Sequence, residues 1–151
     1  MIVGRRFGSL GTLILFTTAC NSDVPVSATT DVVPPGFHVA VTRVATHPFL
    51  ARFNLKITVS TRTGCSATSE LFPDTGGVSR RNLYRANSGH LLVVGQFDAR
   101  RFDVQSCRVE LVEFRSLDAG MTFLGAFDVD DKGNWAFISA AERGERVFER
   151  Q

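Results

Sequence analysis

Two cysteines, Cys65 and Cys107, are the residues whose chemistry is easiest to predict. In an oxidising compartment an even pair of cysteines indicates a disulfide. The loop it would close holds about 40 residues, and the chain-entropy model gives such a bond on the order of 3–4 kcal/mol. The alternative is a reactive or metal-binding thiol, but the spacing is far from Cys-x-x-Cys and no histidine lies nearby in sequence. We predict a disulfide that joins an irregular segment after Gly64 to a strand starting at Cys107.

The three histidines, His38, His47 and His90, form neither an HxH nor an HExxH pattern. Metal sites made by local sequence motifs need such spacing, so we predict no metal ligands and no cofactor. Ser88-Gly89-His90 lacks the GxSxG context of a nucleophile elbow, and no Asp is placed by sequence as a third partner. We therefore predict no catalytic residues and a protein that is not an enzyme. A hydrolase site assembled only in three dimensions stays the less favoured alternative.

Asp128, Asp130 and Gly133 match positions one, three and six of a calcium-binding loop. Position five is Lys132, whose charge would repel the metal, and position twelve is Ser139 where a bidentate Glu is needed. The same residues suit a tight connection between two strands. We predict a hairpin turn here.

Basic residues are mostly Arg, and Lys occurs only at positions 56 and 132. Arg forms bidentate hydrogen bonds with carboxylate and phosphate groups. Arginines are most closely spaced in two stretches, and these residues are candidate contacts for an anionic partner: Arg80, Arg81, Arg85, Arg100 and Arg101. The alternative is that they are solvated loop residues.

Alternating apolar residues predict that these side chains are carried by strands. Residues 37–45 place Phe37, Val39 and Val41 on one face. Residues 52–60 alternate more clearly, and there Phe53, Leu55, Ile57 and Val59 should face the core while Lys56 faces solvent. Further strands are expected at 91–97, 107–115, 121–129 and 134–140.

Residues 61–89 are the least regular part, with several glycines and a proline, and we expect a short helix near 79–85 and loop elsewhere. A last strand or short helix is expected at 145–150. Six to eight short strands without a long amphipathic helix predict an all-β, mainly antiparallel domain, either a small β-sandwich or a barrel. The hairpin FDVDDKGNWAFIS resembles strand pairs of bacterial immunoglobulin-like domains.

The first twenty residues, MIVGRRFGSLGTLILFTTAC, combine two arginines with about ten apolar positions. This stretch is shorter than the roughly twenty residues needed to span a bilayer, and it is typical of a signal peptide. Thr17-Thr18-Ala19-Cys20 then resembles the lipobox of bacterial lipoprotein precursors, although Thr17 stands where that family prefers Leu. The alternatives are an ordinary secretory leader and an uncleaved anchor.

The resemblance implies cleavage before Cys20 and attachment of lipid to its sulfur, with two or three acyl chains holding the protein on a membrane. Because Asn21 follows the cysteine and not Asp, the resemblance favours the outer membrane of the cell envelope. We expect a signal peptide at 1–19, a flexible lipid-anchored linker at 20–36 that holds three of the five prolines, and a β domain at 37–151.

Without Arg5 and Arg6, fifteen basic residues remain against fifteen acidic ones. This balance gives no long-range attraction to nucleic acid. With no catalytic motif, the favoured hypothesis is an envelope lipoprotein whose β domain binds a protein or envelope polymer as an accessory or scaffold subunit. The alternative is a lipoprotein inhibitor of a lysozyme or protease. A flat apolar patch would favour a partner surface, and a protruding loop at 61–89 would favour inhibition.

Overall fold

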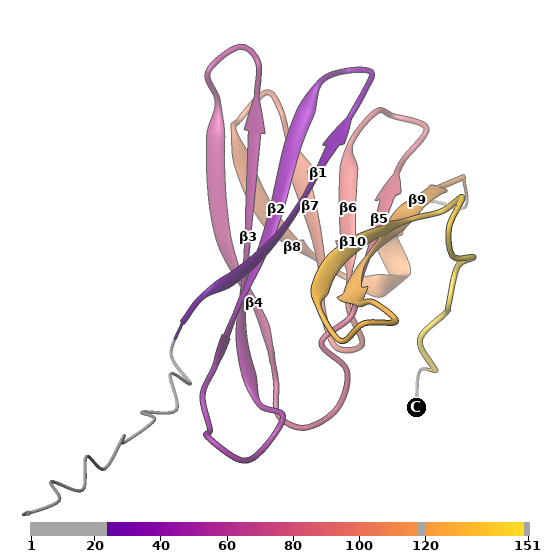
Figure 1. Cartoon of the computed structure of the whole chain (residues 1–151). Coiled ribbons are helices and arrows are strands. Elements are labelled where there is room, and N and C mark those ends of the chain that lie inside the picture. The colour runs from indigo at the N-terminus through magenta and orange to yellow at the C-terminus, as the bar shows by residue number, and fades with distance from the viewer. Residues whose placement is uncertain (1–23, 118–119, 150–151) are drawn as a thin grey trace, which may run out of the picture.

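The computed structural model describes residues 24–117 and 120–149, and it is an all-β structure of two antiparallel sheets packed as a small β-sandwich. Cys20 and the expected signal peptide lie outside the described residues. The four-stranded sheet has the order β1-β2-β3-β4, and the six-stranded sheet has the order β10-β9-β5-β6-β7-β8 (Figure 1). The strands are β1 (Val26–Val32), β2 (Phe37–Ala45), β3 (Phe53–Thr61), β4 (Ser66–Asp74), β5 (Arg81–Arg85), β6 (Leu91–Val94), β7 (Ala99–Asp103), β8 (Arg108–Val112), β9 (Thr122–Val129) and β10 (Trp135–Ser139), with one short 3-10 turn, η1 (Phe114–Ser116).

The main core lies between the two sheets, and the alternating residues of β2 and β3 supply much of it. Val39 and Val41 of β2 are fully buried, and Leu55, Ile57 and Val59 of β3 are each about 1% exposed. Lys56 is exposed and Phe53 is half-buried. The predicted faces of both strands are therefore confirmed, because a period of two sends every second side chain into the core.

A second apolar cluster covers the outer face of the six-stranded sheet. Leu91 and Val93 of β6 face the main core, whereas Leu92 and Val94 belong to the second cluster together with Phe148 of the C-terminal segment. Phe114, Leu117, Met121 and Phe123 pack against the same cluster. This sheet is thus covered on both faces, so successive residues of its central strands β5 and β6 are buried without alternation.

The expected linker at 20–36 is wrong over residues 26–32, because these form strand β1 at the edge of the four-stranded sheet. Ala28 and Val32 enter the core, and the Ser27 and Thr42 hydroxyls are hydrogen-bonded at 2.6 Å. Small polar residues fill most of the other positions. The pairing with β2 therefore holds β1 in place, and its own composition carries little strand signal.

The irregular segment and short helix expected between 61 and 89 are also wrong. Residues 66–74 form β4 and residues 81–85 form β5, so this segment supplies a strand to each sheet. Strand β7 was not expected. Residues 145–149 are irregular and form neither a strand nor a helix. The strands expected at 91–97, 107–115, 121–129 and 134–140 are present within shorter bounds.

Strands β9 and β10 form the predicted hairpin, with Trp135 opposite Val129. The Asp130 carboxylate accepts the backbone N–H groups of Lys132 and Asn134 at 2.9 and 2.8 Å, which confirms the turn. The resemblance to immunoglobulin-like domains does not extend to strand order. Those domains mix strands from distant parts of the chain in each sheet, whereas β1 to β4 follow one another as a meander. Among residues 24–117 and 120–149, no helix is long and apolar enough to cross a membrane.

Candidate functional site

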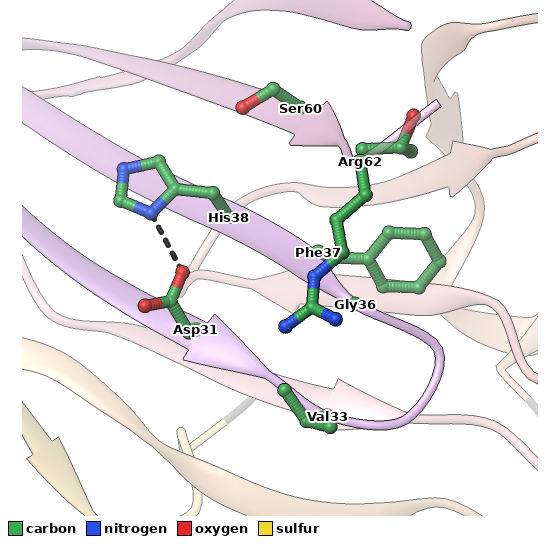
Figure 2. A pocket seen from close by; sticks show the side chains of 8 residues that line it. Asp31, Val33, Gly36, Phe37, His38, Ser60 and Arg62 are labelled. Atoms are coloured by element: carbon green, nitrogen blue, oxygen red, sulfur yellow. Dashed lines mark hydrogen bonds and ion pairs between the residues drawn. The ribbon is translucent and has the colours of Figure 1, made fainter. Parts of the chain in front are cut away.

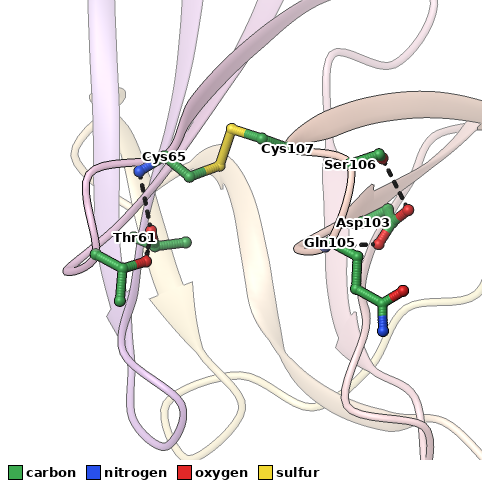
Figure 3. The surroundings of a disulfide bond; sticks show 7 residues. Thr61, Cys65, Asp103, Gln105, Ser106 and Cys107 are labelled. Carbon is green, nitrogen blue, oxygen red and sulfur yellow. Dashed lines mark hydrogen bonds between the residues drawn. A yellow bond between two sulfur atoms is a disulfide. The ribbon is translucent and has the colours of Figure 1, made fainter.

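The predicted disulfide is present, with the Cα atoms of Cys65 and Cys107 5.8 Å apart. Cys65 lies just before β4 and Cys107 just before β8, so the bond joins the edge strands of the two sheets (Figure 3). Two turns support it. The Thr61 hydroxyl accepts the Cys65 N–H at 3.2 Å, and the Asp103 carboxylate accepts the Gln105 N–H and the Ser106 hydroxyl. The disulfide is structural in this setting, because it holds the edges of the two sheets together where β4 and β8 begin.

Arg81 cannot meet an external anion, because its side chain is only 3% exposed. Its Nη1 donates to the carbonyl oxygens of Val78, Ser79 and Arg80, and its Nη2 donates to the Phe72 carbonyl. Burial is the main cause that lowers its pKa, while the Asp98 charge opposes that shift. The sequence interpretation of Arg81 as a partner contact is therefore wrong, since the side chain is buried and four backbone carbonyls bind its two terminal nitrogens.

The other four candidate arginines each have a different partner. Arg100 pairs with Asp98 at 3.4 Å, and Arg101 pairs with Glu110 at 3.2 Å. Arg80 donates to the Arg146 carbonyl and lies over the Phe148 ring, while Arg85 donates to the Pro34 carbonyl. The structure does not gather the five arginines into one basic surface. Arg80, Arg85 and Arg101 instead connect two segments of this chain, while Arg100 pairs with a residue two positions before it.

The three histidines lie on separate segments, and the described part of the chain holds no group of three His, Cys, Asp or Glu side chains that could hold a metal ion. His38 is on β2, His47 is in the connection between β2 and β3, and His90 precedes β6. Asp128, which the sequence places in the calcium-like pattern, forms ion pairs with Arg143 at 3.2 Å and with Arg146.

A polar pocket of about 310 Å³ lies at the end of the sandwich where β1 turns into β2 (Figure 2). Asp31, His38 and Ser60 are consecutive cross-strand neighbours on β1, β2 and β3. The His38 Nδ1 is 2.9 Å from Asp31 Oδ1, as in the histidine–carboxylate pair of a hydrolase triad. The Arg62 side chain packs over Gly36 in the turn, whose φ of 99° suits glycine.

This pocket does not have the arrangement of an activated serine. In a triad the serine hydroxyl is hydrogen-bonded to the other imidazole nitrogen, and within the described residues the His38 ring bonds only to Asp31. The His38 and Asp31 side chains are 51% and 76% exposed, so water surrounds the pair. The pocket can hydrogen-bond a small polar ligand, but it gives the hydrolase alternative no geometric support.

An exposed apolar patch lies on the flank of the sandwich where β4 and β8 meet, and we call Phe72, Phe97 and Leu111 the flank patch. Their exposed fractions are 47%, 61% and 64%. The Phe72 and Phe97 rings are 5.5 Å apart, and Phe97 and Leu111 line the same open hollow of about 600 Å³. Such a cluster of large apolar side chains in water is typical of a binding surface.

Buried charges hold the flank patch in place. Asp98 Oδ2 accepts the Phe72 backbone N–H at 2.9 Å, and the Arg81 guanidinium binds the Phe72 carbonyl. Gly95 leaves room for this guanidinium, because a Cβ there would lie 2.9 Å from Arg81 Nε. Both backbone groups of Phe72 are therefore fixed from the six-stranded sheet, although Phe72 belongs to the other sheet.

No pattern in the amino-acid sequence indicated the flank patch. Its residues come from β4, from the turn between β6 and β7, and from β8. Leu111 also shares a side of its strand with Val109, which packs against the core, so the alternation marks it as a core position. Leu111 stays exposed because it lies on an edge strand, and this position is known only once the two sheets are assembled. Comparison of the chain with protein-family models, curated proteins and solved structures finds no match.

Proposed function

We propose that this chain is a lipoprotein of the bacterial cell envelope, anchored through Cys20, and that its β-sandwich binds a protein partner as an accessory or scaffold subunit. The observation that carries the proposal is the flank patch. Phe72, Phe97 and Leu111 present three large apolar side chains to water on one side of a small domain. Covering such side chains with a partner removes apolar surface from water, which is the dominant favourable term in most protein association.

The chemistry around the patch supports a protein over an envelope polymer. Arg115 at the rim of the hollow is exposed, while Asp98 within it is buried. An apolar centre with a polar rim is the usual anatomy of a protein interface, and aromatic and Arg residues are enriched there. A polyanionic polymer would favour a gathered surface of free basic groups, whereas Arg81 is buried and Arg100 and Arg101 are already paired with carboxylates.

The inhibitor alternative gains no support from residues 61–89. This segment does not protrude as a loop, because β4 and β5 within it are integral to the two sheets.

Site-specific photocrosslinking in intact cells tests the proposal. A photoreactive phenylalanine analogue at position 111 should give one discrete crosslinked protein. The matched control is the same analogue at position 104, because Val104 is an exposed apolar residue in the turn between β7 and β8. Identical crosslinks from both positions, or none from position 111, would contradict a specific partner at the flank patch.

A further inference from the structure

We infer that the connection between β2 and β3, residues 46–52, is a second contact with the membrane and inserts Phe49 and Leu50 into the phospholipid surface. This inference rests on the proposed lipid anchor at Cys20. It makes the β-sandwich dock on the bilayer in one orientation, where a flexible tether alone would leave it free to rotate.

The tip of this connection exposes two large apolar side chains to water. Phe49 is 88% exposed, the highest value among the exposed large apolar side chains, and Leu50 is 49% exposed. The residues from Pro48 to Arg52 are all exposed in succession. Two adjacent large apolar side chains at the end of a projecting hairpin match the shape of a membrane-inserting tip more than that of a groove for a peptide.

Hydrogen bonds hold the tip in an outward conformation. His47 Nδ1 accepts the backbone N–H groups of Phe49 and Leu50 at 3.1 and 3.0 Å. The Arg52 N–H donates to the Leu50 carbonyl at 2.8 Å, and the Thr46 N–H donates to the Arg52 carbonyl at 2.9 Å. These bonds satisfy four backbone donors of the tip within the connection itself. Because the tip is already ordered in the folded protein, it loses less conformational entropy when it docks on the bilayer.

The tip lies at the end of the sandwich that leads to Cys20. The antiparallel register places Val26, the first residue of β1, opposite Arg43 near the end of β2. The start of β1 and the connection between β2 and β3 therefore lie toward the same end of the four-stranded sheet (Figure 1). Cys20 precedes Val26 by six positions. An extended chain of this length reaches at most about 21 Å, so a lipid on Cys20 keeps this end near the bilayer.

The charges and other apolar groups at this end also suit a phospholipid surface. Arg52 is exposed next to the tip, and an Arg near the bilayer is attracted to anionic headgroups. Val24 and Val26, 55% and 44% exposed, add apolar surface where the chain enters β1. The polar pocket with Asp31 and His38 lies at the opposite end of β1, so the end that faces away from the bilayer carries the hydrophilic site.

Tryptophan quenching in vesicles tests this contact. The full chain with Phe49→Trp is produced in bacteria, purified in its processed form and reconstituted into vesicles of phosphatidylethanolamine and phosphatidylglycerol, with or without brominated phosphatidylcholine. Bromine on the acyl chains quenches only a Trp that enters the bilayer. Phe49 is so exposed that its replacement leaves the core intact. Val104→Trp, in the turn between β7 and β8 at the far end, is the matched control. The native Trp135 is buried and gives the same background in both variants.

The expected result is a blue-shifted emission from position 49 that loses most of its intensity with brominated lipid, while position 104 keeps a water-like emission without quenching. Mass spectrometry of the same preparation shows whether Cys20 carries lipid. Lipid on Cys20 with no quenching at position 49 overturns the tip contact and leaves the anchor standing. Absence of lipid with quenching at position 49 overturns the anchor and supports the tip contact. Equal quenching at both positions overturns the single docking orientation.

Discussion

The Asp98 carboxylate lies beside the Arg81 guanidinium, with Oδ1 3.9 Å from Nε, and the two side chains are 5% and 3% exposed. Asp98 also pairs with Arg100 and accepts the Phe72 N–H. This buried pair links the turn between β6 and β7 to β4 and β5. It therefore ties the flank patch to the framework of both sheets.

Asp98→Ala should destabilise the fold by about 3–5 kcal/mol, because it leaves the buried Arg81 charge without its main counter-charge. The measurement is chemical denaturation of the purified protein. The control is Glu110→Ala, which removes the partner of Arg101 from a pair in which both side chains are 42% exposed. That change should cost no more than about 1 kcal/mol, as exposed ion pairs do. Equal losses in the two variants would refute the structural role of the buried pair.

Tyr84 should make the fold sensitive to alkaline pH. Burial first, and then the hydrogen bond to Glu145, raise the pKa of Tyr84 from 10.0 to about 12. A raised pKa means that the folded state favours the neutral phenol. The contribution of the neutral Tyr84 phenol to folding stability is therefore fully present below pH 10. It is lost as the pH rises toward about 12, and the total loss is up to about 2 kcal/mol. The check is the free energy of unfolding of wild type and Tyr84→Phe through this range. Parallel curves for the two proteins would show that Tyr84 is not the responsible group.

The disulfide should contribute on the order of 3–4 kcal/mol, since it closes a long loop in the unfolded chain. The double change Cys65→Ser and Cys107→Ser removes it without leaving a free thiol in the domain. A reducing agent should lower the midpoint of denaturation of the wild type and leave that of the double variant unchanged. If the disulfide of the wild type is fully reduced and its midpoint of denaturation does not fall, this contribution is contradicted.

Cys20→Ser should abolish incorporation of a labelled fatty acid and leave an unprocessed precursor. The reason is that the thiol is the attachment point which the lipobox-like sequence supplies. The control is Cys65→Ser, whose cysteine is expected in a disulfide and not on lipid, and that variant should still incorporate the label. Labelling that persists in Cys20→Ser would remove the anchor from the proposal.

The strands that face the main core on one side could be predicted from sequence. Leu55, Ile57 and Val59 alternate with polar residues because one face of β3 is buried and the other meets water. Strand β5 escaped prediction for the opposite reason. Leu83 faces the main core and Tyr84 faces the second cluster, so successive residues are buried and no alternation remains. The second cluster depends on Phe148, which approaches from the distant C-terminal segment.

The candidate sites were less predictable than the fold because they depend on neighbours that are far away in sequence. Arg81 looked like a surface residue beside Arg80, yet it is buried because the Phe72 carbonyl and Asp98 converge on it. Asp31, His38 and Ser60 come together only through the register of three strands. Short motifs would not show either arrangement. The disulfide was predictable because only one pairing remains once Cys20 is assigned to lipid.

The most direct test of a patch-bound partner is quantitative affinity capture of the full chain from bacterial cells, with bound proteins measured by mass spectrometry. Phe97→Ser combined with Leu111→Ser removes two apolar side chains of the flank patch, and Val104→Ser removes an exposed apolar side chain elsewhere. A partner bound at the flank patch should be recovered as one protein, in equal amounts with the wild type and with Val104→Ser. The patch variant should lose it while folding and anchoring are unchanged. Recovery of the same protein in the same amount with the patch variant would contradict it.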